Sequence, residues 1–598
     1  MSLFKVPSPK PRLARNGFDL SSRRVFSAKA GQLLPVGCWE VNPSEHFRFQ
    51  VQDLVRTTTV NTAAFARMKE YYHFFFVSYR SLWQWFDQFI VGTPNPVSAL
   101  NGIGVLNNSK PDYSFVPKSV PSFDVDSVIN AASKFSDDSQ GFSYFDGAMK
   151  LLNLLGYGVS SNGGRYPYSS LSGGYSKKTS IGIDLIAPFK PVKPKASPLV
   201  SSASPFRLLA YQKIFNDFYR VQDWSTADVR SFNIDDYASD SNLKIEGDVA
   251  AKFCQMRYRP YSKDWITSMK PTPSYDKGIF NLPDYVGHGN GAVSRSSNGV
   301  SGASTFINGV SVLSVNDLRA AFALDKMLEA TRRANGLDYS SQIEAHFGFR
   351  VPESRAGDAR FIGGFDNPVV ISEVVNQSEF DRGADESPCL GDLGGKGVGS
   401  LNSSSIDFDV KEHGIIMCIY SVVPQTEYNG TYFDPFNRKL RREDFFQPEF
   451  ADLGYQPVVT SDLISTYLDN PVPDGPEKQK RLAAGYPLSS IEANNRLLGW
   501  QVRYNEYKTS RDLVFGEFES GLSLSYWCSP RYDFGFDGKA GDKKLVNSPW
   551  SPAHFYVNPS ILNTIFLVSA VKADHFLVNS FFDVKAVRPM SVSGLAGL

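Results

Sequence analysis

Segments with strand patterns gather at the two ends of this 598-residue chain, and helical segments and loops occupy its middle. Near the start, Phe47, Phe49 and Val51 alternate with polar residues and therefore share one face of a strand. Near the end, one face of a further strand carries Phe576, Val578, Phe582 and Val584. For one sheet system to form, the first and last strands must pair across several hundred residues. This order is typical of a sandwich with a large insertion.

Other segments support the same division. Residues 73–77 and 415–423 are continuous apolar runs, as in strands that are buried on both faces. Residues 406–410 and 500–504 alternate again between apolar and polar. Segment 81–92 has helical spacing instead, with one side formed by Leu82, Trp85, Phe86 and Phe89.

The middle of the chain predicts helices at 148–155, 206–221 and 315–335. The last is the clearest, because Ser314 is a suitable N-cap and Gly336 a suitable stop.

Two long segments, 158–198 and 270–313, are rich in Gly and Ser and have no core periodicity. Loops of this length are uncommon inside a compact domain unless they are functional. We therefore divide the chain into a basic N-terminal arm (1–24), first strands (25–92), an insertion region with helices and long loops (93–364), and the remaining strands, loops and C-terminal tail (365–598).

Composition agrees with a β-rich globular protein. Aromatic residues make up 14% of the chain, and 47 Gly and 36 Pro supply many turns. The net charge is only +1, so the whole chain has no strong field for nucleic acid or an anionic membrane. No apolar run reaches the ~18 residues of a membrane span, and we expect no secretory signal at the start. The cysteines are odd in number and far apart, which favours a reducing compartment: Cys38, Cys254, Cys389, Cys418 and Cys528.

Residues 1–24 carry six cations and one acid, Asp19, and Pro7, Pro9 and Pro11 oppose regular structure there. Two interpretations remain open, a solvated tail or an arm that lies along nucleic acid or a partner subunit. The candidate residues for such an arm are Lys5, Lys10, Arg12, Arg15, Arg23 and Arg24.

Sequence motifs for catalysis or metal binding are missing. The seven histidines are at least 21 residues apart, and neither H-E-x-x-H, C-x-x-C nor G-x-S-x-G occurs. His73 and His575 lie in apolar strand patterns, so we expect core or interface residues. The stretch 391–397 superficially resembles a phosphate loop, but position 390 is Leu and position 397 is Gly, so we expect a flexible glycine loop. The sequence predicts no enzyme activity, no cofactor and no metal.

The charged clusters can be explained as solvent-exposed surface without a catalytic role. Asp407 and Asp409 alternate with apolar residues, which predicts a polar strand face more than a glycosidase-like pair. A second carboxylate pair is Asp235 and Asp236. The mixed run 438–444 is interpreted as a solvated face, with a phosphate-contacting or intersubunit patch as the alternative.

Several stretches resemble the major capsid protein of microviruses, the small icosahedral single-stranded DNA phages, and particularly their gokushovirus-like branch. FDLSSRRVFSAKAGQLLPVGCWEVNPSEHFRF at 18–49 is similar to the opening of that family, and HFFFVSYRSLWQWFDQF at 73–89 to its phenylalanine-rich strand and Leu-Trp helix. The helix at 315–348 is the most specific match, and RPMSVSGLAGL at 588–598 matches the family's ending.

The resemblance implies an eight-stranded antiparallel jelly-roll sandwich that assembles as an icosahedral T=1 shell of roughly sixty copies. It also implies packaged circular single-stranded DNA, a small basic DNA-binding protein, minor or pilot virion proteins and a host cell-surface receptor as partners. The protein would be found in the virion, and in the host bacterial cytoplasm during assembly. The long loops at 270–313 and 158–198 are candidates for host attachment.

Two other functions compete with this interpretation. One is a carbohydrate-binding or glycoside-processing β-sandwich protein that uses exposed aromatics such as Trp83, Trp265 or Trp527. The other is a phage spike or adhesin, which would form trimers rather than shells.

Overall fold

The computed structural model describes residues 15–58, 60, 64–92, 117, 119–136, 143–161, 163–164, 202–237, 242–272, 339–349, 357–375, 393–450, 454–465, 494–531, 552–562, 565–566 and 574–592. It also describes short pieces at 176–178, 184–186, 305–307, 310–312, 326–327, 476 and 491. Lys5, Lys10, Arg12 and Cys389 lie outside the described residues.

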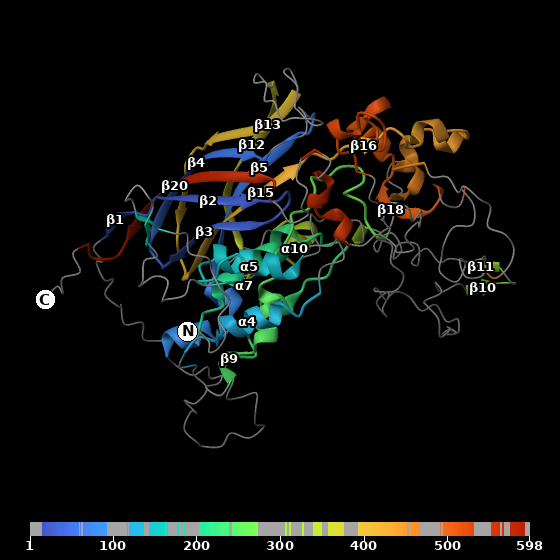
Figure 1. Ribbon diagram of the computed structural model, residues 1–598. Helices are drawn as coiled ribbons and strands as arrows, with labels where there is room; N and C mark the ends of the chain where they lie inside the picture. Colours follow the sequence, from blue (N-terminus) through green and yellow to red (C-terminus); the bar gives the residue numbers. More distant parts are fainter. Residues whose placement is uncertain are drawn as a thin grey trace.

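One antiparallel sheet organises the protein (Figure 1). Its eight-stranded path follows the order β1-β20-β4-β13-β12-β5-β15-β3, with β2 added beside β20 and β14 added beside β4. Strands far apart in the sequence are therefore neighbours in space. The strands are β1 (Asn16–Asp19), β2 (Ser22–Ala28), β3 (Leu34–Val41), β4 (His46–Thr57), β5 (Met68–Ser78), β12 (Arg360–Val375), β13 (Leu393–Asn402), β14 (Ile406–Asp409), β15 (Gly414–Pro424) and β20 (Phe576–Arg588).

The sheet curls so that its two halves face each other across a shared core. Strand β12 joins the halves, because its first part pairs with β5 and its last part, from Val370, pairs with β13. Rings from both halves meet between them: Trp39 of β3 lies 5.2 Å from Phe49 of β4 and 5.9 Å from Phe582 of β20. The predicted eight-stranded antiparallel framework with large insertions is confirmed as this curled sheet.

The two ends of the chain pair as predicted. Strand β20 lies between β4 on one side and β1 and β2 on the other, with Phe576 opposite Thr57 and Val587 opposite His46. Strand β2 begins at Ser22 and β12 at Arg360, a few residues before the boundaries that we drew at 25 and 365.

The strand patterns determine what is buried. The predicted core faces of β4 and β20 are confirmed, because Phe47, Phe49 and Val51 and their counterparts on β20 have at most 1% of their surface exposed. Strand β15, the long apolar run, is buried along its whole length between β5 and β3. Strands with an alternating pattern thus bury only one of their two faces, whereas the apolar strand β15 is buried on both faces.

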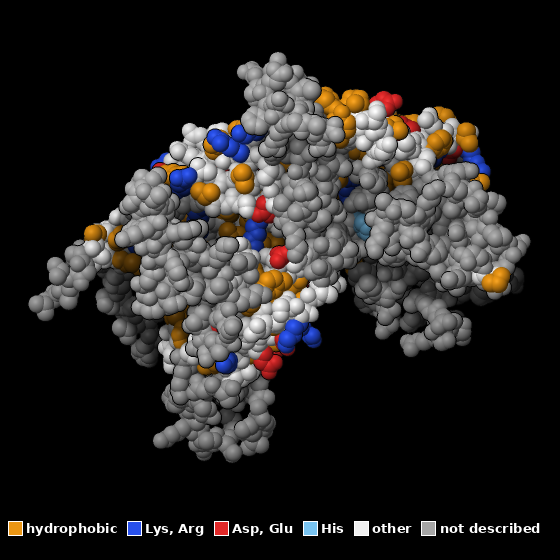
Figure 2. Space-filling model, in the orientation of Figure 1, with side chains coloured by type: hydrophobic (Ala, Val, Ile, Leu, Met, Phe, Trp, Pro, Cys, Tyr) orange, Lys and Arg blue, Asp and Glu red, His pale blue; other side chains and the backbone are white. Residues whose placement is uncertain are grey.

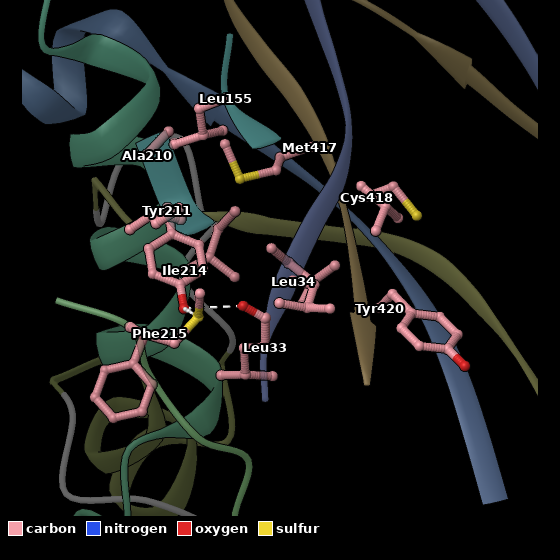
Figure 3. Packing of buried hydrophobic residues seen from close by; sticks show 14 of the residues in the cluster. Leu33, Leu34, Leu155, Ala210, Tyr211, Ile214, Phe215, Met417, Cys418 and Tyr420 are labelled. Atoms are coloured by element: carbon pink, nitrogen blue, oxygen red, sulfur yellow. Dashed lines mark hydrogen bonds between the residues drawn. The ribbon is translucent and has the colours of Figure 1, made fainter. Parts of the chain in front are cut away.

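Helices of the insertion pack against the β3 side of the sheet (Figure 1). They are α4 (Val125–Ala132), α5 (Tyr144–Leu154), α7 (Phe206–Ile214), which continues as one π-helical segment (Phe215–Tyr219), and α8 (Gly247–Phe253). Asp124 caps α4 and Ser143 caps α5 through backbone N–H groups. Figure 3 shows Tyr211 of α7 beside the sheet, where its hydroxyl donates a 2.9 Å hydrogen bond to the carbonyl of Leu33. The helices predicted at 148–155 and 206–221 are confirmed.

The prediction of a single helix at 81–92 is wrong. Two short helices form instead, α1 (Tyr79–Leu82) and α2 (Phe86–Val91). The indole N–H of Trp83 donates to the carbonyl of Tyr237, and that of Trp85 donates to the carbonyl of Asp235. These bonds to the insertion hold the chain between the helices in a non-helical conformation, and Gly92 ends α2 with a left-handed backbone.

The helix predicted at 315–335 lies outside the described residues, except that residues 326–327 are helical. Helix α10 (Tyr339–Phe347) follows it. Within the two long loops, the structure describes 158–161, 163–164 and 270–272. It also describes two hairpins there, β7 (Ser176–Lys178) with β8 (Asp184–Ile186) and β10 (Thr305–Ile307) with β11 (Val310–Val312). Strands β6 (Ser122–Phe123) and β9 (Lys244–Ile245) pair beside α4 and α8.

A second, smaller core lies beside the main sheet, at the right of Figure 1. Its buried residues are Trp265, Ile266, Met269, Tyr428, Val458, Leu463, Leu498 and Phe555. Two small sheets frame it, β16 (Tyr428–Asn429) with β19 (Leu513–Val514) and β17 (Tyr455–Val459) with β18 (Leu497–Val502). Its connections contain single 3-10 turns, among them Pro435–Arg438, Arg442–Asp444, Pro448–Phe450, Asn505–Tyr507, Gly516–Phe518 and Ser525–Trp527.

A polar cluster lies inside the main sandwich. Asp53 of β4 and Glu70 of β5 are hydrogen bonded to each other, and both are buried. Tyr72 donates to Asp53 at 2.6 Å, and Asn367 of β12 donates to Glu70 at 2.8 Å. Burial, with a further contribution from the adjacent Asp53 carboxylate, raises the pKa of Glu70 to about 8. Glu70 therefore keeps its proton at neutral pH. Because only one of the two carboxyl groups is then charged, both can lie in the same apolar site.

This shared proton predicts a pH dependence of stability. Between pH 5 and pH 8 the folded chain keeps Glu70 protonated whereas the unfolded chain ionises it, so the free energy of unfolding falls as pH rises. In Glu70→Gln this contribution, at most about 1.4 kcal/mol per pH unit, disappears. Urea-unfolding midpoints at several pH values measure the difference between the two proteins. The exposed control Glu449→Gln should keep the wild-type slope, and equal slopes for Glu70→Gln and wild type would contradict the prediction.

Candidate functional surfaces

The predicted basic residues that the structure describes do not form one site. Arg15 is exposed and hydrogen bonds to the hydroxyl of Ser44. Arg23 and Arg24 belong to β2, whose alternation turns them to opposite faces of the sheet. Arg23 is exposed and donates to the side chain of Asn579 at 2.7 Å, whereas Arg24 is half-buried. Strand pairing therefore separates residues that the sequence presents as one cluster.

Of the two histidines that we expected to be core or interface residues, His575 is buried and His73 is half-buried. The Nδ1 atom of His73 is 2.7 Å from the Tyr219 hydroxyl, and the His575 ring stacks on Phe566 with ring centroids 4.9 Å apart. Burial lowers the pKa of His73 to about 3, with a further contribution from the Arg259 charge, and burial lowers that of His575 to about 4. Both rings are thus neutral packing groups at physiological pH.

The glycine-rich stretch is part of a strand, so the predicted flexible loop is wrong. Gly397 lies within β13, and its N–H donates to the Thr57 hydroxyl at 2.7 Å. A Cβ at this position would lie 2.3 Å from the Thr57 methyl group, which explains why glycine is needed there. The glycines allow close packing of β13 on β4 and do not form a phosphate cradle.

The paired carboxylates are structural. Asp407 and Asp409 are exposed on β14, as predicted for a polar strand face, and lie 3.7 and 2.8 Å from the His46 ring. Asp235 accepts the Gln84 backbone N–H at 2.8 Å, next to the Trp85 bond that separates α1 from α2.

Two of the tryptophans that a sugar-binding protein would expose lie in the interior. Trp83 is fully buried and Trp265 belongs to the second core. Trp527 is half-buried against Phe65, with ring centroids 5.2 Å apart. Across the described ranges there is no group of three or more His, Cys, Asp or Glu side chains placed to hold a metal ion. Nor does any helix in those ranges have the length and apolar character of a membrane span.

Large apolar side chains instead gather on the surface around the second core (Figure 2). The Tyr507 ring contacts both Phe436 and Phe446, and the Lys439 ammonium lies 4.0 Å from the centre of the Tyr507 ring. We call this the aromatic surface, and its exposed members are Phe433, Phe436, Leu440, Phe445, Phe446 and Tyr507. The mixed run at 438–444 supplies its charged rim, and Arg438 forms a 2.7 Å ion pair with Asp462. Neither the aromatic content nor the charge run alone predicted this arrangement.

Comparisons with known proteins agree with a surface-based function. Residues 6–129 and 303–598 match the family model described as Capsid protein (F protein). The chain is 22% identical over 653 residues to Capsid protein VP1 of Chlamydia phage 1, and this match covers 99% of the chain and 96% of the relative. It is 22% identical over 304 residues to Capsid protein VP1 of Bdellovibrio phage phiMH2K, covering 48% and 47%.

The matched residues include every strand of the curled sheet and omit 130–302, which holds much of the insertion. The chain therefore belongs to the Capsid protein (F protein) family of Microviridae phages, whose members are structural proteins of the virion capsid and not enzymes.

Proposed function

We propose that the chain assembles into an icosahedral T=1 shell of about 60 copies around a circular single-stranded DNA genome. The observation that carries this proposal is the aromatic surface. Leu440 has 87% of its surface exposed and Phe445 has 53%, with cations at the rim. Apolar patches of this kind on a folded chain mark contacts with other proteins, and aromatic residues are enriched in such contacts.

A closed shell explains why the contacts need only be modest. Each subunit repeats every contact around the symmetry axes, so weak pairwise contacts add up when the shell closes. The near-zero net charge of the chain limits repulsion between packed copies. The same neutrality implies that a small basic DNA-binding protein neutralises most of the genome charge, and minor or pilot proteins complete the virion.

Leu440→Asp combined with Phe445→Ser tests the aromatic surface. Both side chains are exposed, so the folded subunit should persist with unchanged circular dichroism, whereas each altered contact should lose about 2 kcal/mol. We expect subunits without spherical particles by size-exclusion chromatography and negative-stain microscopy. The control Val229→Asp changes an exposed apolar residue of the insertion and should leave particles intact. Wild-type particle yield from the double variant would refute the role of this surface.

We further propose that residues 1–14 face inward or lie along neighbouring subunits, with Lys5, Lys10 and Arg12 near phosphate groups. This boundary keeps Asn16–Asp19, which pair with β20. Deleting 1–14 should lower the particle yield or the DNA retained per particle, measured from the absorbance ratio of purified particles. A variant with Lys5, Lys10 and Arg12 changed to Ser separates the two roles, because only the DNA role depends on charge. If the deletion variant kept the wild-type particle yield and DNA content, residues 1–14 would have no role in assembly or DNA binding.

Segment 270–313 is our first candidate for an outward projection that contacts the host receptor, and 158–198 is the second. The reasons are length, Gly and Ser content and the lack of core periodicity. A short peptide tag inserted after Gly291 should be accessible to antibody on intact particles. A tag after Ala573, ahead of β20 in the sequence, serves as the assembly control. If the tag at 291 reacts only after particles are disrupted, the outward position is wrong.

A further inference from the structure

The outer face of the β2-β20-β4-β13 half of the sheet, turned away from the sandwich core, has a regular chemical pattern. Strand pairing aligns its side chains in rows across the strands. One row holds Leu577, Arg56 and Val398, and another holds Arg23, Phe581 and Gln52. Between them stand Val25, Asn579, Leu54 and Ser400. These rows mix exposed apolar residues, cations and amides on one surface.

The apolar residues of these rows are exposed to solvent, although the core of the sheet is filled by other residues. Phe581 has 41% of its surface exposed, Leu577 51% and Val25 69%. Their strand neighbours Phe582, Val578 and Phe576 fill the core on the opposite face, so the exposed residues are not needed to bury the core. An aromatic ring and aliphatic side chains on the solvent side of a sheet can pack against a ligand that has flat apolar or aromatic groups.

Charge divides the outer face into two parts. At the β1 end, Lys585 pairs with Asp19 at 2.7 Å and with Asp583 at 3.3 Å, and Arg48 stands opposite Asp407. This end is charge-balanced. The rows that contain Arg23 and Arg56 include no carboxylate among their described residues, and we call them the cationic rows. The carboxylates beyond the two ends of these rows are paired with lysines, Asp583 with Lys585 at 3.3 Å and Asp574 with Lys150 at 3.0 Å.

Figure 2 shows the same combination, with Lys and Arg side chains and hydrophobic side chains close together over the area where Figure 1 draws β4, β20 and β2. The rows of Arg56 and Phe581 are four residues apart along β4, about 14 Å at the rise of a strand. A few nucleotides of an extended strand can cover this distance.

We propose that the cationic rows bind single-stranded nucleic acid. Phe581 offers a stacking surface for a base, Arg56 and Arg23 attract phosphate, and Gln52 and Asn579 can hydrogen bond to base edges. This combination matches an exposed single strand, because a duplex keeps its bases stacked on each other and offers no free base face. The inference rests on the proposed function in one respect: in a shell, this sheet face would be turned to the genome.

Binding of a fluorescent 20-residue oligothymidine to the purified, unassembled full chain tests the proposal by anisotropy at several salt concentrations. Phe581→Ser should weaken binding about fivefold or more without changing the salt dependence, because it removes stacking. Arg56→Ala should weaken binding and reduce the slope of log K against log salt by about 0.7, because it removes one phosphate contact. Both residues are exposed, so circular dichroism should be unchanged.

Matched controls come from the charge-balanced end of the same strands. Arg48→Ala on β4 and Val587→Ser on β20 should bind the oligonucleotide within about twofold of wild type. If wild type does not bind it, or if Phe581→Ser and Arg56→Ala bind as wild type does, the proposal is wrong. If these two variants stop shell assembly while their binding is unchanged, the rows contact another copy of the chain, which also overturns it. Particle formation by the wild type, seen by microscopy, tests the proposed function separately, since the oligonucleotide assay needs no shell.

Discussion

The fold depends on the insertion of the last strand between two of the first. Strand β20 pairs with β4 along almost its whole length and with β1 and β2 on its other edge. Without β20, β1 and β2 would have no partner in the sheet, β4 would lose its partner on one edge, and the Trp39 ring would lose its contact with Phe582. Closure over so long a loop costs entropy, which a large apolar core offsets.

The pairing also determines where function can lie. Because side chains alternate along a strand, β20 gives one face to the core and presents Leu577 and Phe581 outside. The family match includes the framework strands and omits 130–302, which holds helices α5, α7 and α8. A capsid protein needs surfaces that contact copies and cargo. We propose the aromatic surface and the outer sheet face as such surfaces, whereas His575, Asp53 and Glu70 are buried packing groups.

Local patterns predicted most of the framework. Alternation identified the core faces of β4 and β20, and the apolar run identified β15, because these periods depend only on neighbouring residues. The candidate arm was visible as a run of cations, but its members Arg23 and Arg24 are separated by strand alternation. Arg56 and Phe581 were not predicted, because each is one residue in an alternating strand, and no local signal joins residues that are 525 positions apart.

The sequence by itself determined the strand segments, the pairing of its ends and the absence of local catalytic motifs, since hydrophobic period and residue spacing are properties of short segments. The eight-stranded antiparallel arrangement was expected only from the family resemblance. Tertiary structure alone decided the break between α1 and α2, where distant carbonyls bind Trp83 and Trp85, and the strand at Gly397, which packs on Thr57. It also decided the rows of the outer face. Register between strands sets these contacts, and register follows from the packing of the whole core.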